Sequence, residues 1–138
     1  MTAERSADVM RRYLVEVVGA GDLALLAELA HPDMTDHTAI AAGWGSGREG
    51  LERHVTSFRS AMTDLEIEIE RLVAASDEVA AIWRVTGTHV GELFGVEPTG
   101  RRVSYRNASV FRLRDGRIDD YVGVWDGLTA VRQMTRPA

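Results

Sequence analysis

The chain of 138 residues contains no cysteine. This absence excludes a disulfide framework, a thiolate nucleophile and a cysteine-based zinc site, so packing alone must stabilise the fold. It also fits a reducing cytoplasm, which is the compartment we expect. The four histidines lack the clustered or i, i+4 spacing of metal ligands, and the glycine-rich segment 43–50 does not match a phosphate-binding loop. We therefore expect no metal and no cofactor.

Excess positive charge and long apolar runs are absent as well. The formal net charge is -5, and the arginines are scattered among acidic residues. Phosphate binding needs clustered basic side chains, so nucleic acid is excluded as a partner. No run of roughly 18 apolar residues is present, and the polar segment 1–8 lacks the apolar core of a signal peptide. We expect a soluble protein with no membrane partner.

The chain does contain enough apolar sequence for one domain. With 45% hydrophobic residues it can bury a core but is too short for two domains, so we expect residues 1–138 to form a single domain. Apolar residues follow helical spacing first and alternate with a period of two later. We expect, in chain order, helices over 7–18, 22–29 and 51–62, strands over 65–70, 79–89, 103–114 and 117–125, and a closing helix over 127–134.

Residues 34–44 are too irregular for a helix, and we interpret them as a short strand followed by a loop. Helices first and antiparallel strands second predict an α+β fold with the helices on one face of the sheet. A strongly curved sheet around those helices would leave a cavity at its open end.

Six short segments that together span nearly the whole chain carry a family resemblance. In order they are Ala20-Gly21-Asp22-Leu23, His31-Pro32-Asp33, Gly87-Thr88-His89-Val90-Gly91, Pro98-Thr99-Gly100-Arg101, Phe111-Arg112-Leu113-Arg114-Asp115-Gly116-Arg117-Ile118 and Trp125-Asp126. Together they resemble the SnoaL-like polyketide cyclases, a family with the nuclear transport factor two fold. The resemblance implies a cone-shaped α+β barrel, in which N-terminal helices pack on a strongly curved antiparallel sheet that encloses a cavity.

The resemblance also implies a cofactor-independent enzyme that holds an aromatic polycyclic polyketide intermediate in this cavity. Cyclases of the family use an Asp on the last strand as base, with a His on the preceding strand. The positions resembling these two residues hold Gly123 and Ser109 here, and neither can take a proton from carbon near neutral pH. Some relatives are cofactor-independent hydroxylases, so we expect hydroxylation. Cyclisation of a polyketide ester by an intramolecular aldol reaction is the alternative.

Polar residues on the strand 103–114 are the first site candidates. If Ser109 faces inward, the period of two places Tyr105 and Asn107 on the same face. A polar ladder on an otherwise apolar face needs partners, which are substrate oxygens in a cavity or neighbouring side chains in a core. We predict catalytic roles for Tyr105 and Asn107 and a substrate-binding role for Ser109.

Aromatic residues supply the remaining substrate-binding candidates. The period of two places Asp119, Tyr121, Gly123 and Trp125 on one face of the last strand. Gly123 would leave a gap there, and Tyr121 and Trp125 would flank it as stacking surfaces for an aromatic ligand. Trp83 lies in mid-strand, as cavity wall or core. Trp44 lies in a glycine-rich loop and is expected to cover the cavity mouth.

Two further candidates lie near element ends. His37, with Asp36 beside it, follows the second helix where the resembling steroid isomerases carry an Asp base, so its imidazole is a candidate base for an acidic phenol or enol. Such an anion is what cofactor-free attack on dioxygen requires. An exposed loop histidine is the alternative. Asp126 precedes a helix and is interpreted as its N-cap, with orientation of the substrate as the second interpretation.

Other functions stay open on the same scaffold. The chain could be an isomerase or epoxide hydrolase, or a ligand-binding dimer without catalysis. Homodimerisation through packed sheets is expected because the predicted outer sheet face is apolar. That face carries Ile82, Arg84, Ala108, Val110, Val122 and Val124.

Overall fold

The computed structural model describes residues 2–137 and begins with a continuous helical segment. Helix α1 (Ala3–Arg12) is capped by Thr2, whose hydroxyl accepts the N–H of Arg5, and it runs on as a π-helix, η1 (Tyr13–Gly19). A 3₁₀ turn, η2 (Leu23–Leu25), then leads into α2 (Leu26–Leu29). The two expected N-terminal helical segments are therefore confirmed. The widened π-helical turns begin at Tyr13, a type of distortion that is frequent at functional sites.

The segment after α2 differs from the expectation in one respect. Strand β1 (Ala30–Asp36) is present, but the predicted loop after it is wrong, because α3 (His37–Ala42) forms there. The Asp36 carboxylate accepts the N–H groups of Thr38 and Ala39 at 3.0 and 3.2 Å, and Gly43 ends the helix at a φ of 76°. An N-cap and a left-handed C-terminal residue together stabilise a helix that periodicity alone does not reveal.

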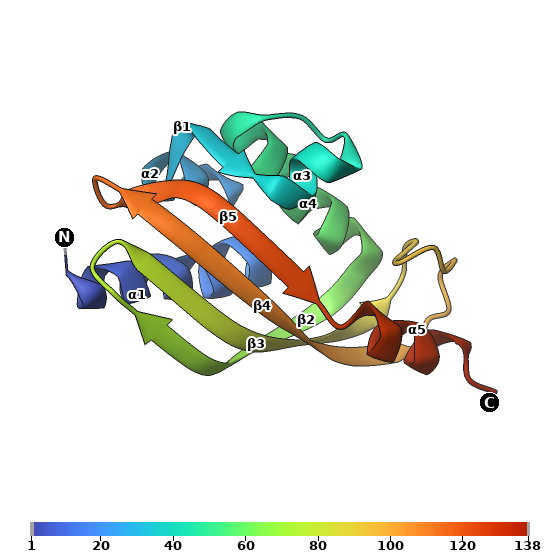
Figure 1. Ribbon diagram of the computed structural model, residues 1–138. Helices are drawn as coiled ribbons and strands as arrows, with labels where there is room; N and C mark the ends of the chain where they lie inside the picture. Colours follow the sequence, from blue (N-terminus) through green and yellow to red (C-terminus); the bar gives the residue numbers. More distant parts are fainter. Residues whose placement is uncertain (1, 138) are drawn as a thin grey trace.

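Helix α4 (Gly47–Ala61) precedes the antiparallel strands β2 (Met62–Ala74), β3 (Glu78–His89), β4 (Arg102–Arg114) and β5 (Arg117–Trp125). Within residues 2–137 the strands form one sheet in the order β1-β5-β4-β3-β2, with β1 parallel to β5. Figure 1 shows the sheet curving around the helices, with α5 (Gly127–Thr135) beside the β3–β4 loop at one end. The predicted α+β fold with a strongly curved sheet is confirmed.

The alternation along β4 and β5 decides which side chains can reach a cavity. Tyr105, Asn107 and Ser109 are buried on the inner face of β4, as predicted. On β5 a bulge pairs Leu113 with Ile118 and Arg112 with Asp120, which leaves Asp119 as an extra residue. The expected inward position of Asp119 is therefore wrong. Its carboxylate instead accepts the guanidinium of exposed Arg114 at 3.1 Å.

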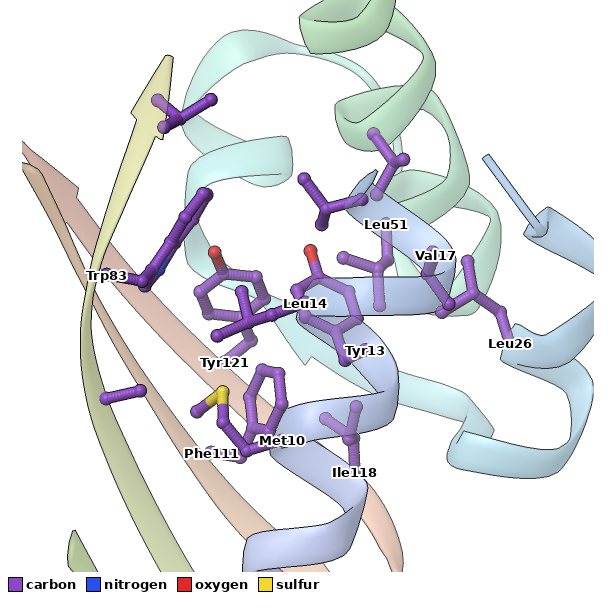
Figure 2. Close-up of a cluster of buried hydrophobic side chains, with 14 of the residues drawn as sticks. Met10, Tyr13, Leu14, Val17, Leu26, Leu51, Trp83, Phe111, Ile118 and Tyr121 are labelled. Carbon is purple, nitrogen blue, oxygen red and sulfur yellow. The ribbon is translucent and has the colours of Figure 1, made fainter. Parts of the chain in front are cut away.

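The core packs the first helical segment against the inner sheet face (Figure 2). Tyr13 meets Phe111 and Tyr121 edge to face, with ring centroids 5.1 and 5.9 Å apart. Such pairs stabilise the fold beyond the area they bury. This packing holds Tyr13 and Tyr121 in place where the core borders the cavity described next. No helix within residues 2–137 is long and apolar enough to span a membrane.

Candidate active site

A cavity of about 320 Å³ lies between the inner sheet face and the helices. Its wall is mainly apolar and includes Val18, Val55, Phe58 and Leu93, while its polar side chains come from η1, α3, α4, β3, β4 and β5 and from the two loops α3–α4 and β3–β4. A small number of polar groups in an apolar cavity is the usual composition of a small-molecule site. The chemistry of the site therefore depends on those few polar side chains.

A partly buried aspartate–histidine pair supplies an acid–base group at the cavity. Nδ1 of His54, on α4, lies 2.8 Å from Oδ2 of Asp36, at the end of β1. The Asp36 side chain is 1% exposed and the His54 side chain 16%. Because Oδ1 of Asp36 already accepts two N–H groups of α3, the carboxylate is held in one orientation. It fixes the hydrogen of the neutral ring on Nδ1 and leaves the Nε2 lone pair free to act as a base.

The sequence interpretation overlooked His54, and the signal for it was available. On α4 this residue lies three positions after Leu51 and four before Phe58, so it shares the helix face that carries these two apolar residues. Its partner Asp36 comes from a distant segment, and no local pattern connects the two residues.

His37 does not lie where it was expected. Nε2 of His37 contacts Oδ1 of Asp120 at 2.8 Å, and its side chain is 54% exposed. His37 is not among the cavity-lining residues. The reason is that Asp36 takes the buried N-cap position of α3, so that the first residue of the helix points to the surface. The predicted placement of this imidazole in the cavity is wrong.

A chain of hydrogen bonds crosses the sheet wall of the cavity. The indole N–H of Trp83 donates to Ser109 Oγ at 3.0 Å, and Ser109 Oγ lies 3.3 Å from the Tyr121 hydroxyl. Ser109 and Tyr121 line the cavity, as the sequence predicted, and so does Trp83, for which the sequence left cavity wall or core open. Burial raises the pKa of Tyr121 to about 12, so the phenol keeps its hydrogen near neutral pH. The Tyr121 ring stacks on the His54 imidazole with centroids 5.9 Å apart, which places a phenol donor beside the base.

The other two β4 candidates have different environments. Asn107 lines the cavity, and its buried amide nitrogen has no hydrogen-bond partner among the described residues. An unpaired buried donor is costly, and a ligand oxygen would satisfy it. Tyr105 is buried but does not line the cavity, because the Phe94 ring packs against it with centroids 5.6 Å apart. The predicted inward direction of Tyr105 is right, while its access to the cavity is not.

Aromatic rings surround the cavity around His54. Trp44, in the α3–α4 loop, lies 5.4 Å from the His54 ring, and Phe94 stacks on Trp125 at 6.1 Å with an interplanar angle of 17°. All three line the cavity, and Trp125 is 40% exposed. Flat rings arranged in this way can stack on an aromatic ligand. Trp44 and Trp125 were predicted here, whereas Phe94 was not.

Gly123 lies near the end of β5 and Asp126 just after it, and neither leaves space or a carboxylate in the cavity. The gap predicted at Gly123 is filled, because a Cβ built there would lie only 2.7 Å from Cε1 of Tyr121 and 2.9 Å from its hydroxyl oxygen. Asp126 caps α5, accepting the backbone N–H of Thr129 at 3.1 Å and its hydroxyl at 2.6 Å. These hydrogen bonds lower the pKa of Asp126. The N-cap interpretation is confirmed, and Asp126 does not line the cavity.

Comparison with known proteins identifies related sequences and folds. The family model described as SnoaL-like polyketide cyclase matches residues 7–134. Nogalonic acid methyl ester cyclase of Streptomyces nogalater is 27% identical over 125 residues, which are 90% of this chain and 93% of the relative. Aklanonic acid methyl ester cyclase DnrD of Streptomyces peucetius is 30% identical over 133 residues, which are 94% and 90% of the two chains. The solved structure of TsrD from Streptomyces laurentii has a TM-score of 0.86 at 23% identity, covers 98% of each chain and shows the same fold.

Proposed function

This chain belongs to the SnoaL-like polyketide cyclase family, and we propose that it closes a ring in an aromatic polyketide ester by an intramolecular aldol reaction with His54 as base. The observation that carries this proposal is the partly buried Asp36–His54 pair, whose histidine lines an otherwise mainly apolar cavity. Imidazole is the side chain most often used in general acid–base catalysis, because it can both take and return a proton.

The proposed reaction needs only proton transfer and carbon–carbon bond formation. Nε2 of His54 takes a proton from an acidic carbon next to a carbonyl group, and that carbon then attacks a ketone carbon of the same molecule. The resulting alkoxide receives the proton back from His54, so that the product has the mass of the substrate. Asp36 stabilises the imidazolium formed in between and keeps its ring in orientation. No electron donor or acceptor is involved.

The cavity lining favours an uncharged aromatic substrate. Aromatic side chains flank the base, and the unpaired amide nitrogen of Asn107 would donate to a substrate carbonyl oxygen. No arginine is among the described lining residues, and the carboxylate among them is Glu92. A substrate carboxylate would therefore enter without a compensating cation, which is unfavourable in an apolar cavity. An ester in its place avoids this cost.

Cyclisation ranks above hydroxylation because the curated relatives are named as methyl ester cyclases and His54 supplies the base that such a reaction needs. The sequence-based preference for hydroxylation rested on Gly123 and Ser109, which occupy the positions of the family's acid–base pair. The Asp36–His54 pair supplies a base from other elements, and the curated relatives are named as methyl ester cyclases. Hydroxylation by dioxygen begins with the same deprotonation. It is the second candidate, favoured by the lack of a carboxylate at position 123.

We also propose that two copies pack through the outer faces of their sheets. Val110, Val122 and Val124 are 37%, 45% and 62% exposed there, and Ile82 is 38% exposed beside them. An apolar sheet face of this kind is favourably buried against a second copy.

The reaction type can be tested by incubating the protein with anthraquinone methyl esters that carry an uncyclised 1,3-dicarbonyl side chain. The incubations run with and without dioxygen and are analysed by mass spectrometry. A ring-closed product of unchanged mass in both atmospheres supports cyclisation. A gain of one oxygen under dioxygen alone supports hydroxylation, and an unchanged substrate contradicts both.

A further inference from the structure

Position 123 on β5 has no side chain, and the side chain of Tyr121 takes that space. A Cβ at Gly123 would lie 2.9 Å from the Tyr121 hydroxyl oxygen and 2.7 Å from Cε1, closer than real Cβ atoms come to other heavy atoms. The φ of Gly123 is outside the left-handed region, so the backbone does not itself require glycine there. Glycine is required because the phenol ring of Tyr121 lies along β5, over position 123.

The hydrogen bonds behind the phenol allow Tyr121 to keep its hydrogen for a ligand. An indole N–H can only donate, so Trp83 uses one lone pair of Ser109 Oγ. Either hydroxyl can donate across the 3.3 Å between Ser109 Oγ and the Tyr121 oxygen, and in one arrangement Ser109 donates to Tyr121. In this arrangement the hydrogen of Tyr121 is free to point to a ligand in the cavity. The chain from Trp83 through Ser109 also polarises the phenol as a donor.

The surroundings place this donor next to the proposed base. The ring of Tyr121 stacks on the imidazole of His54 with an interplanar angle of 25°. Figure 2 shows the hydroxyl groups of Tyr13 and Tyr121 pointing to the same side of the core, and both residues line the cavity. Burial, followed by the nearby Tyr121 and Asp36, raises the pKa of Tyr13 well above its ordinary value, so this phenol also stays neutral.

We propose that Tyr121 is a catalytic residue whose hydroxyl donates a hydrogen bond to the substrate carbonyl oxygen as it becomes the alkoxide, and that Gly123 creates the space this hydroxyl needs. The inference rests on the proposed function. It adds the group that stabilises the negative charge, while His54 moves the proton. No proton leaves Tyr121, because only its hydrogen bond shortens as the oxygen becomes charged.

The binding of 1-naphthol tests this role without the natural substrate. Near neutral pH the free probe is a neutral phenol, and the absorbance of the bound probe reports the ratio of naphtholate to naphthol. The expected result is that Tyr121→Phe lowers this ratio about 10- to 100-fold, which corresponds to one lost hydrogen bond to a charged oxygen. Binding of the neutral form changes little, because the phenyl ring is kept.

A second variant displaces the same hydroxyl by a substitution at Gly123. Gly123→Ala pushes the phenol aside and is expected to lower the naphtholate ratio like Tyr121→Phe. Gly127→Ala is the matched control, since a Cβ there lies 3.5 Å from its nearest neighbour, an ordinary contact. Thermal denaturation checks that each variant is folded.

Two results would overturn the proposal. One is a naphtholate ratio in Tyr121→Phe equal to that of the unaltered protein, and the other is an unaltered protein that binds only neutral naphthol. Failure of the proposed function would instead be seen as the absence of any ring-closed product from the unaltered protein, whatever the naphthol data show.

Discussion

Replacing His54 should abolish most of the activity, whereas replacing His37 should not. Both residues are histidines beside an aspartate oxygen at 2.8 Å, so the two variants make a matched pair. His54→Gln removes an imidazole at the cavity, and His37→Gln removes one that is 54% exposed and outside it. The comparison therefore separates a role in the cavity from the mere presence of a histidine–aspartate contact.

The expected loss of kcat or of stability in each variant follows from where its histidine lies. Loss of a general base lowers kcat about 100- to 10,000-fold, so His54→Gln should fall in that range. Loss of an exposed contact between polar side chains costs about 0–1 kcal/mol of stability, so His37→Gln should keep both its fold and its kcat. Asp36→Asn tests the same pair from the other side, since an amide can no longer stabilise the imidazolium.

The assay is the initial rate of ring closure for each variant at saturating substrate, with the thermal midpoint measured in parallel. A folded His54→Gln with unaltered kcat would refute the assignment of the base. A large loss of kcat in a folded His37→Gln would refute it equally, because it would place the chemistry on the α3 surface.

Three other outcomes are expected from the structure. Trp125→Ala should raise KM about tenfold, because stacking of this ring on an aromatic substrate would contribute about 0.5–1.5 kcal/mol. Stability should fall little, because Trp125 is partly exposed. Binding curves measure the first quantity and melting curves the second. The free energy of unfolding should fall as the pH rises from about 10 to about 12. In the unfolded chain Tyr121 ionises near its ordinary pKa of about 10, while burial in the folded protein raises its pKa to about 12. Urea unfolding at several pH values measures this, and the absence of a decline would contradict it. Val122→Arg combined with Val124→Arg should yield a monomer in sedimentation, and a dimer that survives both changes would show that the copies do not pack through this face.

Much of the fold can be predicted from local pattern. The period of two in β4 identified the buried face that carries Asn107 and Ser109, because each residue of a regular strand faces opposite to the last. The Asp-Gly-Leu sequence at 126–128 identified a helix cap because this contact is local as well. Its hydrogen bond joins Asp126 and Thr129, which are only three positions apart.

The site was harder to predict because its key contacts are not local. Asp36 and His54 come from β1 and α4, and only the folded chain brings their side chains to 2.8 Å. A bulge of one residue near Asp119 changed the inward set on β5, and no composition signal marks it. The position of the Tyr121 ring over Gly123 also involves a hydrogen bond to Ser109 on β4, which no local pattern reveals.

The most direct test of the central claim is whether His54 removes a proton from carbon. The measurement is the rate at which the acidic carbon of a side-chain 1,3-dicarbonyl ester exchanges hydrogen for deuterium in D₂O, followed by NMR with the unaltered protein, His54→Gln and buffer alone. We expect exchange well above the buffer rate with the unaltered protein and a rate close to that of buffer with His54→Gln. Equal acceleration by both proteins would contradict it.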